Sequence, residues 1–360
     1  MRTIIKLSNH SNLFYSYERV YIMEKIKVGH IGTRHDHSRA KLEAIKKFPN
    51  LFEVVGIVPE DEKVAARIKN DAVYGGIPIM TEEELFAVEG LELVLCEGYE
   101  LDSVAAAQRC IDHGVHVHLD KPGGEDIAAY EKLLRDAKAK NLVVQLGYMY
   151  RYNPAILYID ELVKDGRIGD ITAIDAQMST MHDMRVMKLL SGFKGGNMFW
   201  LGCHLIDLTY RFAGIPDEII PMHNKSDLIM EGVVDNTFAV MKYPKFVASI
   251  RVNSQEVNGF GRRQFVLCGK NGSVELKPIE NPIKLTFSDR RFISNAYSDT
   301  KAEIPFAPPS GRYDIMVKDL FCYIRGTKQN PYTYEYELQL QRMVLAACGF
   351  DIDFKTPIEL

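Results

Sequence analysis

Residues 26–47, IKVGHIGTRHDHSRAKLEAIKK, decide the fold class, because they pass from an apolar run through a glycine turn into a helical pattern. The short run at 26–32 predicts a buried strand. Apolar residues at helical spacing in 38–47 predict a helix with one buried face. A strand that enters a helix through a tight turn is the first step of an α/β fold.

The same alternation of strand and helix continues to residue 147. Further strands are expected at 52–58, 91–96, 115–120 and 141–148, and helices at 60–69, 102–113 and 126–140. Strands joined by helices form a parallel sheet with right-handed crossovers. Residues 24–147 are therefore predicted to be a doubly wound, Rossmann-type dinucleotide-binding domain.

The second half of the chain changes from alternating elements to strands that follow one another. Helices are expected at 153–164, 198–212, 311–326 and 334–348, and a first strand at 169–177. Between 218 and 296 strand signals dominate, and they include RRFISN at 290–295. This pattern predicts a second α/β domain over 148–360, with a large, open, mostly antiparallel sheet for substrate binding and oligomerisation.

Composition excludes several classes of protein. The chain has 360 residues, enough for two domains, and 44 basic against 48 acidic residues, so nucleic-acid binding through bulk charge is not expected. No apolar run approaches the ~18–20 residues that span a bilayer, so no membrane partner is expected. Six cysteines without CxxC spacing indicate free thiols in a reducing cytoplasm. Residues 1–23 are interpreted as an extension before a natural start at Met23, with a packed arm as the alternative.

The turn after the first expected strand is the candidate site for a dinucleotide pyrophosphate, because a helix N-terminus favours an anion. Its candidate cofactor contacts are Gly32, Thr33, Arg34, His35 and His37. The glycine fingerprint is degraded, since Arg34 and His37 stand where its second and third glycines would be. The two histidines also admit a metal by type, but no third ligand with suitable spacing stands nearby, and no metal is expected.

The end of the second expected strand normally carries an acid for the adenosine ribose. Here Pro59 holds that position and Glu60 follows. Glu60 fits a ribose contact and, equally, the start of a helix. NAD is therefore favoured over NADP as the cofactor.

Four motifs in order resemble the Gfo/Idh/MocA family, named after glucose-fructose oxidoreductase and inositol dehydrogenase. They are the glycine turn, Asp120-Lys121-Pro122, the crossover GYMYRYNP at 147–154, and GGNMFWLGCHLID at 195–207. The resemblance covers about 26–350. It implies the two domains above, a nicotinamide cofactor, a sugar or polyol substrate, and a homodimer or homotetramer.

The resemblance also implies roles for individual residues. Lys121 would be the catalytic acid/base, since an ammonium can stabilise the alkoxide that forms when hydride leaves a carbinol carbon. Lys121 and Pro122 would also contact the cofactor. His204 would be the second catalytic group, and Asp207 would orient the His204 ring or contact substrate. Without the family pattern, a histidine on an apolar helix is more often a core residue.

This chain departs from the family at position 200. Many family dehydrogenases have an aspartate four residues before the histidine, and here Trp200 stands there. Three alternatives stay open. Lys121 and His204 suffice with Trp200 stacked on a sugar, Asp183 in the loop with His182 supplies the acid, or the chain binds its ligands without hydride transfer.

A second departure follows Cys96, where Glu97-Gly98-Tyr99-Glu100 replaces the family's usual nicotinamide-ribose segment. These acids could bind cofactor or sugar, replace the acid lost at position 200, or lie in a solvated loop. In the crossover motif, Tyr148 and Arg151 are candidate substrate contacts, and Arg151 is favoured as a structural ion-pair anchor.

The motifs together predict an NAD(P)-dependent oxidoreductase of carbohydrate metabolism that acts on CH–OH groups. Two other functions stay open. One is a non-catalytic regulator or scaffold that responds to NAD(P) or sugar. The other is a sugar lyase or epimerase that oxidises its substrate transiently and recycles the cofactor.

Overall fold

The computed structural model describes residues 24–280, 284–306 and 311–360, so the expected extension at 1–23 lies outside the described residues. The chain forms two compact units. Within the described residues, unit 1 comprises 24–119, Asp136–Gln145 and Tyr313–Pro331, and unit 2 comprises Asp120–Arg135, Leu146–Arg312 and Tyr332–Leu360. The domain division between residues 147 and 148 stays a prediction.

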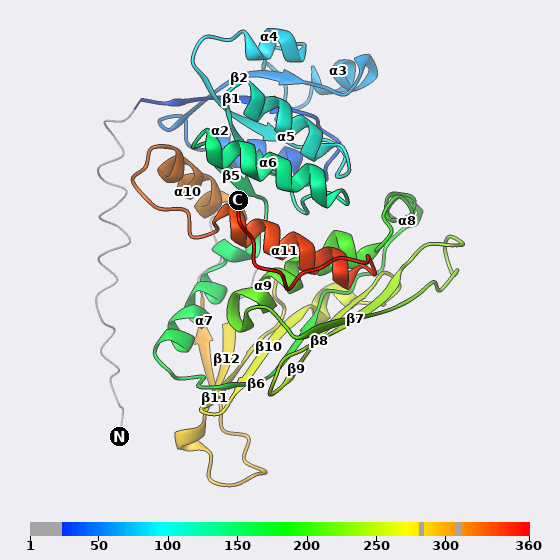
Figure 1. Ribbon diagram of the computed structural model, residues 1–360, viewed down its shortest axis with the longest axis vertical. Coiled ribbons are helices and arrows are strands. Elements are labelled where there is room, and N and C mark those ends of the chain that lie inside the picture. The colour runs from blue at the N-terminus through cyan, green and yellow to red at the C-terminus, as the bar shows by residue number, and fades with distance from the viewer. Residues whose placement is uncertain (1–23, 281–283, 307–310) are drawn as a thin grey trace. The chain divides into compact units, whose positions relative to one another are not determined.

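Unit 1 is built on a parallel sheet, as the alternating pattern predicted (Figure 1). Its strands, in the spatial order β2-β1-β3-β4-β5, are β1 (Ile26–Ile31), β2 (Phe52–Val58), β3 (Leu91–Cys96), β4 (His116–Leu119) and β5 (Val144–Leu146). Strand β1 pairs in parallel with β2 on one side and with β3 on the other. The turns that follow β1 and β3 therefore lie at the point where strand order reverses, which is where ligands bind in such sheets.

Helices connect these strands. They are α2 (Ser38–Lys46), α3 (Glu62–Ile68), α4 (Glu82–Phe86), α5 (Ser103–Asp112) and α6 (Ile127–Ala139), and α10 (Asp314–Ile324) packs against α2. Helix α3 begins after residue 60, because the Asp61 side chain caps it by accepting a hydrogen bond from the Val64 N–H. The short helix α4, which the sequence analysis did not predict, starts with a Thr81–Glu84 capping box.

Unit 2 carries a large, mostly antiparallel sheet, which confirms the predicted fold class. Among the described residues its order is β13-β12-β11-β10-β6-β9-β8-β7, and only the β6–β9 pair is parallel. The strands are β6 (Ile171–Gln177), β7 (Glu218–Asn224), β8 (Asn236–Lys242), β9 (Val247–Asn253), β10 (Gln264–Gly269), β11 (Gly272–Leu276), β12 (Lys284–Asp289) and β13 (Ala302–Pro305).

One strand prediction in this region is wrong. RRFISN at 290–295 forms the 3₁₀ helix η5 (Arg290–Phe292) instead, because the Asp289 side chain accepts the Arg291 N–H and turns the chain. Strand β13, which the sequence analysis did not predict, then pairs with β12.

Helices in unit 2 pack on one face of the sheet and against each other. They are α7 (Pro154–Lys164), α8 (Met184–Leu190), α9 (Cys203–Ala213) and α11 (Tyr334–Ala347), with 3₁₀ helices η2 (Met149–Tyr152) and η4 (Gly259–Arg262). Helix α9 packs on β6 and β9, and α11 packs on β7 and α9 (Figure 1). Ala248, Ile250 and Val252 alternate as buried residues along β9, as expected for a sheet with one covered face.

The helix expected at 198–212 is divided. Residues Met198–Gly202 form a π-helical turn, η3, and α9 begins only at Cys203. Among the described residues, no helix is both long and apolar enough to span a bilayer.

Candidate active site

The turn after β1 in unit 1 requires glycine. Gly32 has φ +82°, and a Cβ atom at this residue would lie 2.5 Å from the backbone of Gly98. Both the left-handed conformation and the close approach exclude larger residues. Gly32 therefore lets the turn after β1 pack directly on the segment after β3.

Glu60 binds this turn rather than starting a helix. Its Oε1 atom accepts hydrogen bonds from the Thr33 N–H at 2.6 Å and the Arg34 N–H at 2.7 Å. Its Oε2 atom accepts from the Thr33 hydroxyl at 2.9 Å. The backbone N–H groups of the turn thus hold an anionic oxygen, as a phosphate-binding turn must.

Arg34 reaches into solvent, where its Nη2 atom lies 3.7 Å from Asp61. An exposed pair of this kind contributes at most ~1 kcal/mol. His35 is buried, and its Nδ1 atom accepts the His37 N–H at 3.1 Å. The rings of these two histidines lie 4.8 Å apart.

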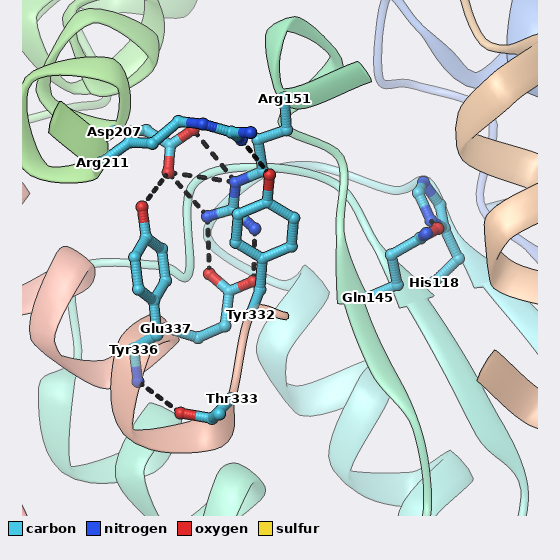
Figure 2. A network of polar contacts seen from close by, with 9 residues as sticks. All are labelled: His118, Gln145, Arg151, Asp207, Arg211, Tyr332, Thr333, Tyr336 and Glu337. Carbon is cyan, nitrogen blue, oxygen red and sulfur yellow. Dashed lines mark hydrogen bonds and ion pairs between the residues drawn. The ribbon is translucent and has the colours of Figure 1, made fainter. Parts of the chain in front are cut away.

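Behind the turn lies a cluster of buried charges in unit 1. Lys41 of α2 donates to Glu97 at 2.9 Å, and both side chains are at most 1% exposed. His118 of β4 places Nε2 3.8 Å from Glu97, and its Nδ1 atom lies 2.9 Å from Gln145 Oε1 (Figure 2). Glu100 is also buried and lies 3.5 Å from His35. The alternative of a solvated loop at Glu97 and Glu100 is therefore wrong.

Lys121, two residues after the end of β4, belongs to unit 2 and is 1% exposed. The loop that follows it is tied to α11 by one glutamine: Gln341 accepts the Gly123 N–H at 2.9 Å and donates to the Gly124 carbonyl at 2.5 Å. Pro122 is buried in the same loop. The Lys121 ammonium donates to the backbone carbonyl of Trp200 at 2.7 Å. This loop therefore presents a buried ammonium at a defined position.

Trp200 lies in η3 and contacts two other predicted site residues. Its ring centroid is 5.6 Å from Lys121 Nζ and 5.6 Å from the His182 ring. The indole is 8% exposed, so it packs against these neighbours. Asp183 instead caps α8 by accepting the Val186 N–H at 3.0 Å, and no hydrogen bond joins it to Lys121 among the described residues.

His204 of α9 is held edge-to-face between two tyrosines of the crossover motif. Its ring centroid lies 5.7 Å from that of Tyr148 and 4.9 Å from that of Tyr150. The Tyr150 hydroxyl donates to Glu280, which also accepts from Arg263. This packing fixes the plane of the imidazole. Burial raises the pKa values of both tyrosines well above 10, so they remain protonated.

Arg151 is the centre of a buried ion-pair network in unit 2 (Figure 2). Its guanidinium donates to Asp207 at 2.8 and 3.0 Å and to Glu337 at 2.5 and 2.9 Å. The Tyr332 ring stacks 3.9 Å from the guanidinium, and Tyr336 donates to Asp207 at 3.2 Å. Arg151 thus has the contacts of a structural anchor.

The Arg151 network also accounts for Asp207. Both of its carboxylate oxygens accept hydrogen bonds from Arg151, and no hydrogen bond joins Asp207 to His204 among the described residues. Burial raises the pKa of Glu337 above its ordinary value, and Arg151 opposes that rise. The side chains of this network support η2, on which Tyr150 faces His204.

Sequence reasoning missed the residues that hold the site in place. Glu337 and Gln341 come from α11, and Lys41 comes from α2. Glu337 stands 186 positions after its partner Arg151. No local pattern links such residues; the only signal was the acid and the glutamine on the mostly apolar face of α11.

Parts of the chain are similar in sequence to known proteins. Residues 156–275 match the sequence model of the GFO/IDH/MocA C-terminal domain. A Bacillus subtilis protein named as an oxidoreductase, YteT, is 24% identical over 49% of this chain, and the match spans only 43% of that protein. The "Uncharacterized oxidoreductase ORF334" of Rhizobium meliloti is 23% identical over 90% of this chain and 96% of its own length.

Solved structures share the fold. A levoglucosan dehydrogenase in complex with NADH and levoglucosan gives a TM-score of 0.77 at 14% identity, covering 91% of this chain and 98% of that chain. KijD10, a 3-ketoreductase from Actinomadura kijaniata in complex with TDP-benzene and NADP, gives 0.73 at 18% identity, covering 90% and 96%. The resemblance predicted from the motifs is thus confirmed: residues 156–275 match the GFO/IDH/MocA C-terminal domain model, and the chain shares its fold with oxidoreductases of solved structure.

Proposed function

We propose that this chain is an NAD(P)-dependent oxidoreductase that transfers hydride between a nicotinamide cofactor and a sugar, polyol or related hydroxy compound. The observation that carries the proposal is the Lys121 ammonium. An ammonium has three N–H donors. Among the described residues, Lys121 Nζ has one hydrogen-bond acceptor, the Trp200 carbonyl, so two donors remain for a substrate oxygen.

In this proposal, Lys121 transfers the proton of the substrate hydroxyl. In the oxidising direction, Lys121 Nζ in its amine form accepts the hydroxyl proton while the carbinol C–H bond breaks. In the reducing direction the Lys121 ammonium returns that proton to the oxygen. When bound, the nicotinamide ring supplies the carbon that takes or returns the hydride. His204, held in plane by its two tyrosines, donates a second hydrogen bond to the same oxygen.

Tyr148 supports a substrate contact. Its hydroxyl is buried and, among the described residues, has no hydrogen-bond partner. A buried hydroxyl without a partner costs ~1–3 kcal/mol, which a substrate oxygen would recover. Because burial raises its pKa well above 10, Tyr148 serves as a neutral donor and not as an acid. Trp200 lies beside Lys121, and His182 lies beside Trp200; both would line the substrate site.

In this proposal the cofactor lies along the turn after β1, whose Thr33 and Arg34 N–H groups hold the Glu60 carboxylate in place. Glu60 would face the adenosine ribose hydroxyls, and the N-terminus of α2, with His35 and His37, would face the pyrophosphate. A carboxylate at this position repels a 2′-phosphate, which favours NAD over NADP. Both cofactors occur among the similar structures, in the levoglucosan dehydrogenase and in KijD10. A cytoplasmic homodimer or homotetramer stays a prediction from the resemblance.

The first experiment is to unfold the purified protein, identify released nucleotides by mass spectrometry, and titrate fresh protein with NAD and NADP. A sugar and polyol screen then follows both NADH absorbance and product. Lys121→Met should lower kcat by about 10²-fold or more and leave the cofactor Kd unchanged. Lys164→Met, at a 72% exposed side chain, is the matched control and should keep full activity.

Two outcomes would redirect the proposal. Failure to bind either nucleotide would refute both dehydrogenase and cofactor-recycling chemistry and leave a regulator or scaffold. Product without net change in NADH would indicate transient oxidation followed by elimination or epimerisation.

A further inference from the structure

Many dehydrogenases of the family that the motifs resemble are expected to have an aspartate where this chain has Trp200. The side chain at this residue carries no charge, yet the Lys121 ammonium has a hydrogen-bond acceptor 2.7 Å away. That acceptor is the main-chain carbonyl of Trp200, and the Cys203 thiol lies 3.5 Å from the same oxygen. The hydrogen-bond acceptor that position 200 gives to Lys121 is thus a neutral backbone group.

The Trp200 carbonyl belongs to a π-helical turn, η3. Hydrogen bonds in a π turn span five residues and not four, so the carbonyl ladder is displaced by one position where the turn meets α9. Such turns are rare and often lie at functional sites. Here the turn covers Met198–Gly202, with Trp200 at its centre.

The position of this carbonyl is set by close packing around η3. A Cβ atom at Gly196, where φ is +49°, would lie 1.9 Å from the Val234 carbonyl. The Asn197 N–H donates to that same carbonyl at 3.2 Å, and the Asn197 side chain donates to Ser254 at 2.7 Å. At the other end, a Cβ atom at Gly202 would lie 2.5 Å from the Met198 sulfur, which is the end of a flexible side chain. The N-terminal end of the turn is therefore fixed by backbone packing and by the two hydrogen bonds of Asn197.

The indole completes the environment of the ammonium. Its ring lies 5.6 Å from Lys121 Nζ, at the outer range of a cation–π contact, and its other neighbour is the His182 ring. The indole ring packs beside the Lys121 ammonium, whereas the Trp200 carbonyl accepts a hydrogen bond from it. These two contributions can be separated, because every substitution at position 200 except one that disturbs the turn keeps the carbonyl.

We propose that the Trp200 main-chain carbonyl, presented by the π turn, is the positioning group for Lys121 and replaces the side-chain acid. The inference rests on the proposed function for its kinetic readouts. A neutral acceptor takes one N–H of the ammonium without placing a negative charge beside it, which leaves the other two N–H groups for substrate. Trp200 is thus a positioning residue, and Lys121 remains the catalytic one.

Exchange of one peptide bond for an ester tests the carbonyl directly. Incorporating the α-hydroxy acid analogue of leucine at position 201 turns the Trp200 carbonyl into an ester carbonyl, which is a weaker acceptor. We expect kcat to fall about tenfold with the cofactor Kd unchanged. The matched control places the same leucine analogue at Leu162 in α7, which weakens the Glu161 carbonyl instead, and kcat should stay within about twofold of wild type.

Substitutions of the Trp200 side chain provide a second test of the proposal. Trp200→Phe keeps the carbonyl and removes the indole, so its loss of kcat measures the contribution of the ring and should be smaller than the loss in the ester variant. Trp200→Asp adds a carboxylate beside the ammonium and should shift the pH dependence of kcat upward by about one pH unit, because the proton is held more tightly. Equal loss of kcat in Trp200→Phe and in the ester variant would overturn the proposal in favour of the indole.

A crystal structure separates failure of this inference from failure of the proposed function. Lys121 Nζ within hydrogen-bond distance of the Trp200 carbonyl, together with inactivity on every substrate, would retain the geometry and refute the dehydrogenase. A Nζ–carbonyl separation above about 4 Å would overturn the positioning role whatever the activity.

Discussion

Replacing Arg151 with methionine separates a structural anchor from a substrate contact. Arg151→Met keeps the volume of the side chain but leaves Asp207 and Glu337 buried without the cation that binds both. Removing one partner of a buried pair costs about 3–5 kcal/mol. For a unit of this size that corresponds to a fall in melting temperature of roughly 6–20 °C.

Unfolding of unit 2 can be followed on its own. Trp200 is the only tryptophan in the chain and lies in unit 2, so its fluorescence reports that unit during urea or thermal denaturation. Arg135→Met, which removes an exposed pair with Glu131, is the matched control and should cost less than ~1 kcal/mol.

The pH dependence of the Arg151→Met deficit follows from the sign of the pKa shifts. Burial already raises the pKa of Glu337, and loss of Arg151 removes the group that opposes the rise. A raised carboxyl pKa in the folded state stabilises the fold at low pH and loses that contribution as pH rises through the folded value. The deficit should therefore shrink on acidification. Adding Asp207→Asn and Glu337→Gln should recover at least half of it at neutral pH.

The anchor reasoning would be refuted by a variant with an unchanged unfolding midpoint and a raised KM. In that case Arg151 would contact substrate. If the stability lost in Arg151→Met grew on acidification, unpaired carboxylates could not be the cause of that loss.

Three further predictions follow from single contacts. Burial lowers the pKa of His30 from 6.5 to about 3, so stability should fall as pH drops below 6.5, by up to ~1.4 kcal/mol per pH unit, and His30→Gln should flatten this slope in acid-unfolding curves. Gly32→Ala should lower the free energy of unfolding by about 2–4 kcal/mol, because its Cβ would meet the backbone of Gly98. Calorimetry should show nucleotide binding weakened more than tenfold. Unchanged binding would mean that this turn is not part of the cofactor site. Tyr148→Phe should raise KM severalfold and leave the melting temperature equal or higher, since it removes a buried hydroxyl without a protein partner.

Much of the fold was predictable from local patterns. The strands Ile26–Ile31, Phe52–Val58 and Leu91–Cys96 lie where continuous apolar runs predicted them, because a parallel strand is buried on both faces. The strand prediction at 290–295 was wrong. Its apolar and β-branched residues resemble a strand, but the Asp289 side chain turns the backbone. Propensity is a weak predictor where one hydrogen bond of this kind decides the local structure.

The candidate site was predictable only in part. Motif positions located Lys121, His204 and Arg151, which the structure buries within one unit, and they located Glu60 next to the turn that it binds. The partners of these residues were not predictable. Glu337 and Gln341 lie far along the chain, and Asp183 proved to be a helix cap.

Residue types and their spacing set the alternation of apolar runs and helical stretches, and with it the parallel sheet, the antiparallel sheet and the order of the motifs. They did so because burial of apolar faces depends on residue type and spacing alone. The contact that holds Lys121 was visible only after folding, since its acceptor is a backbone carbonyl, a group present at every residue, and this one lies in the π turn at Met198–Gly202. Likewise, only packing showed that Asp207 serves Arg151, because a carboxylate binds whichever cation the fold brings nearest in a buried environment.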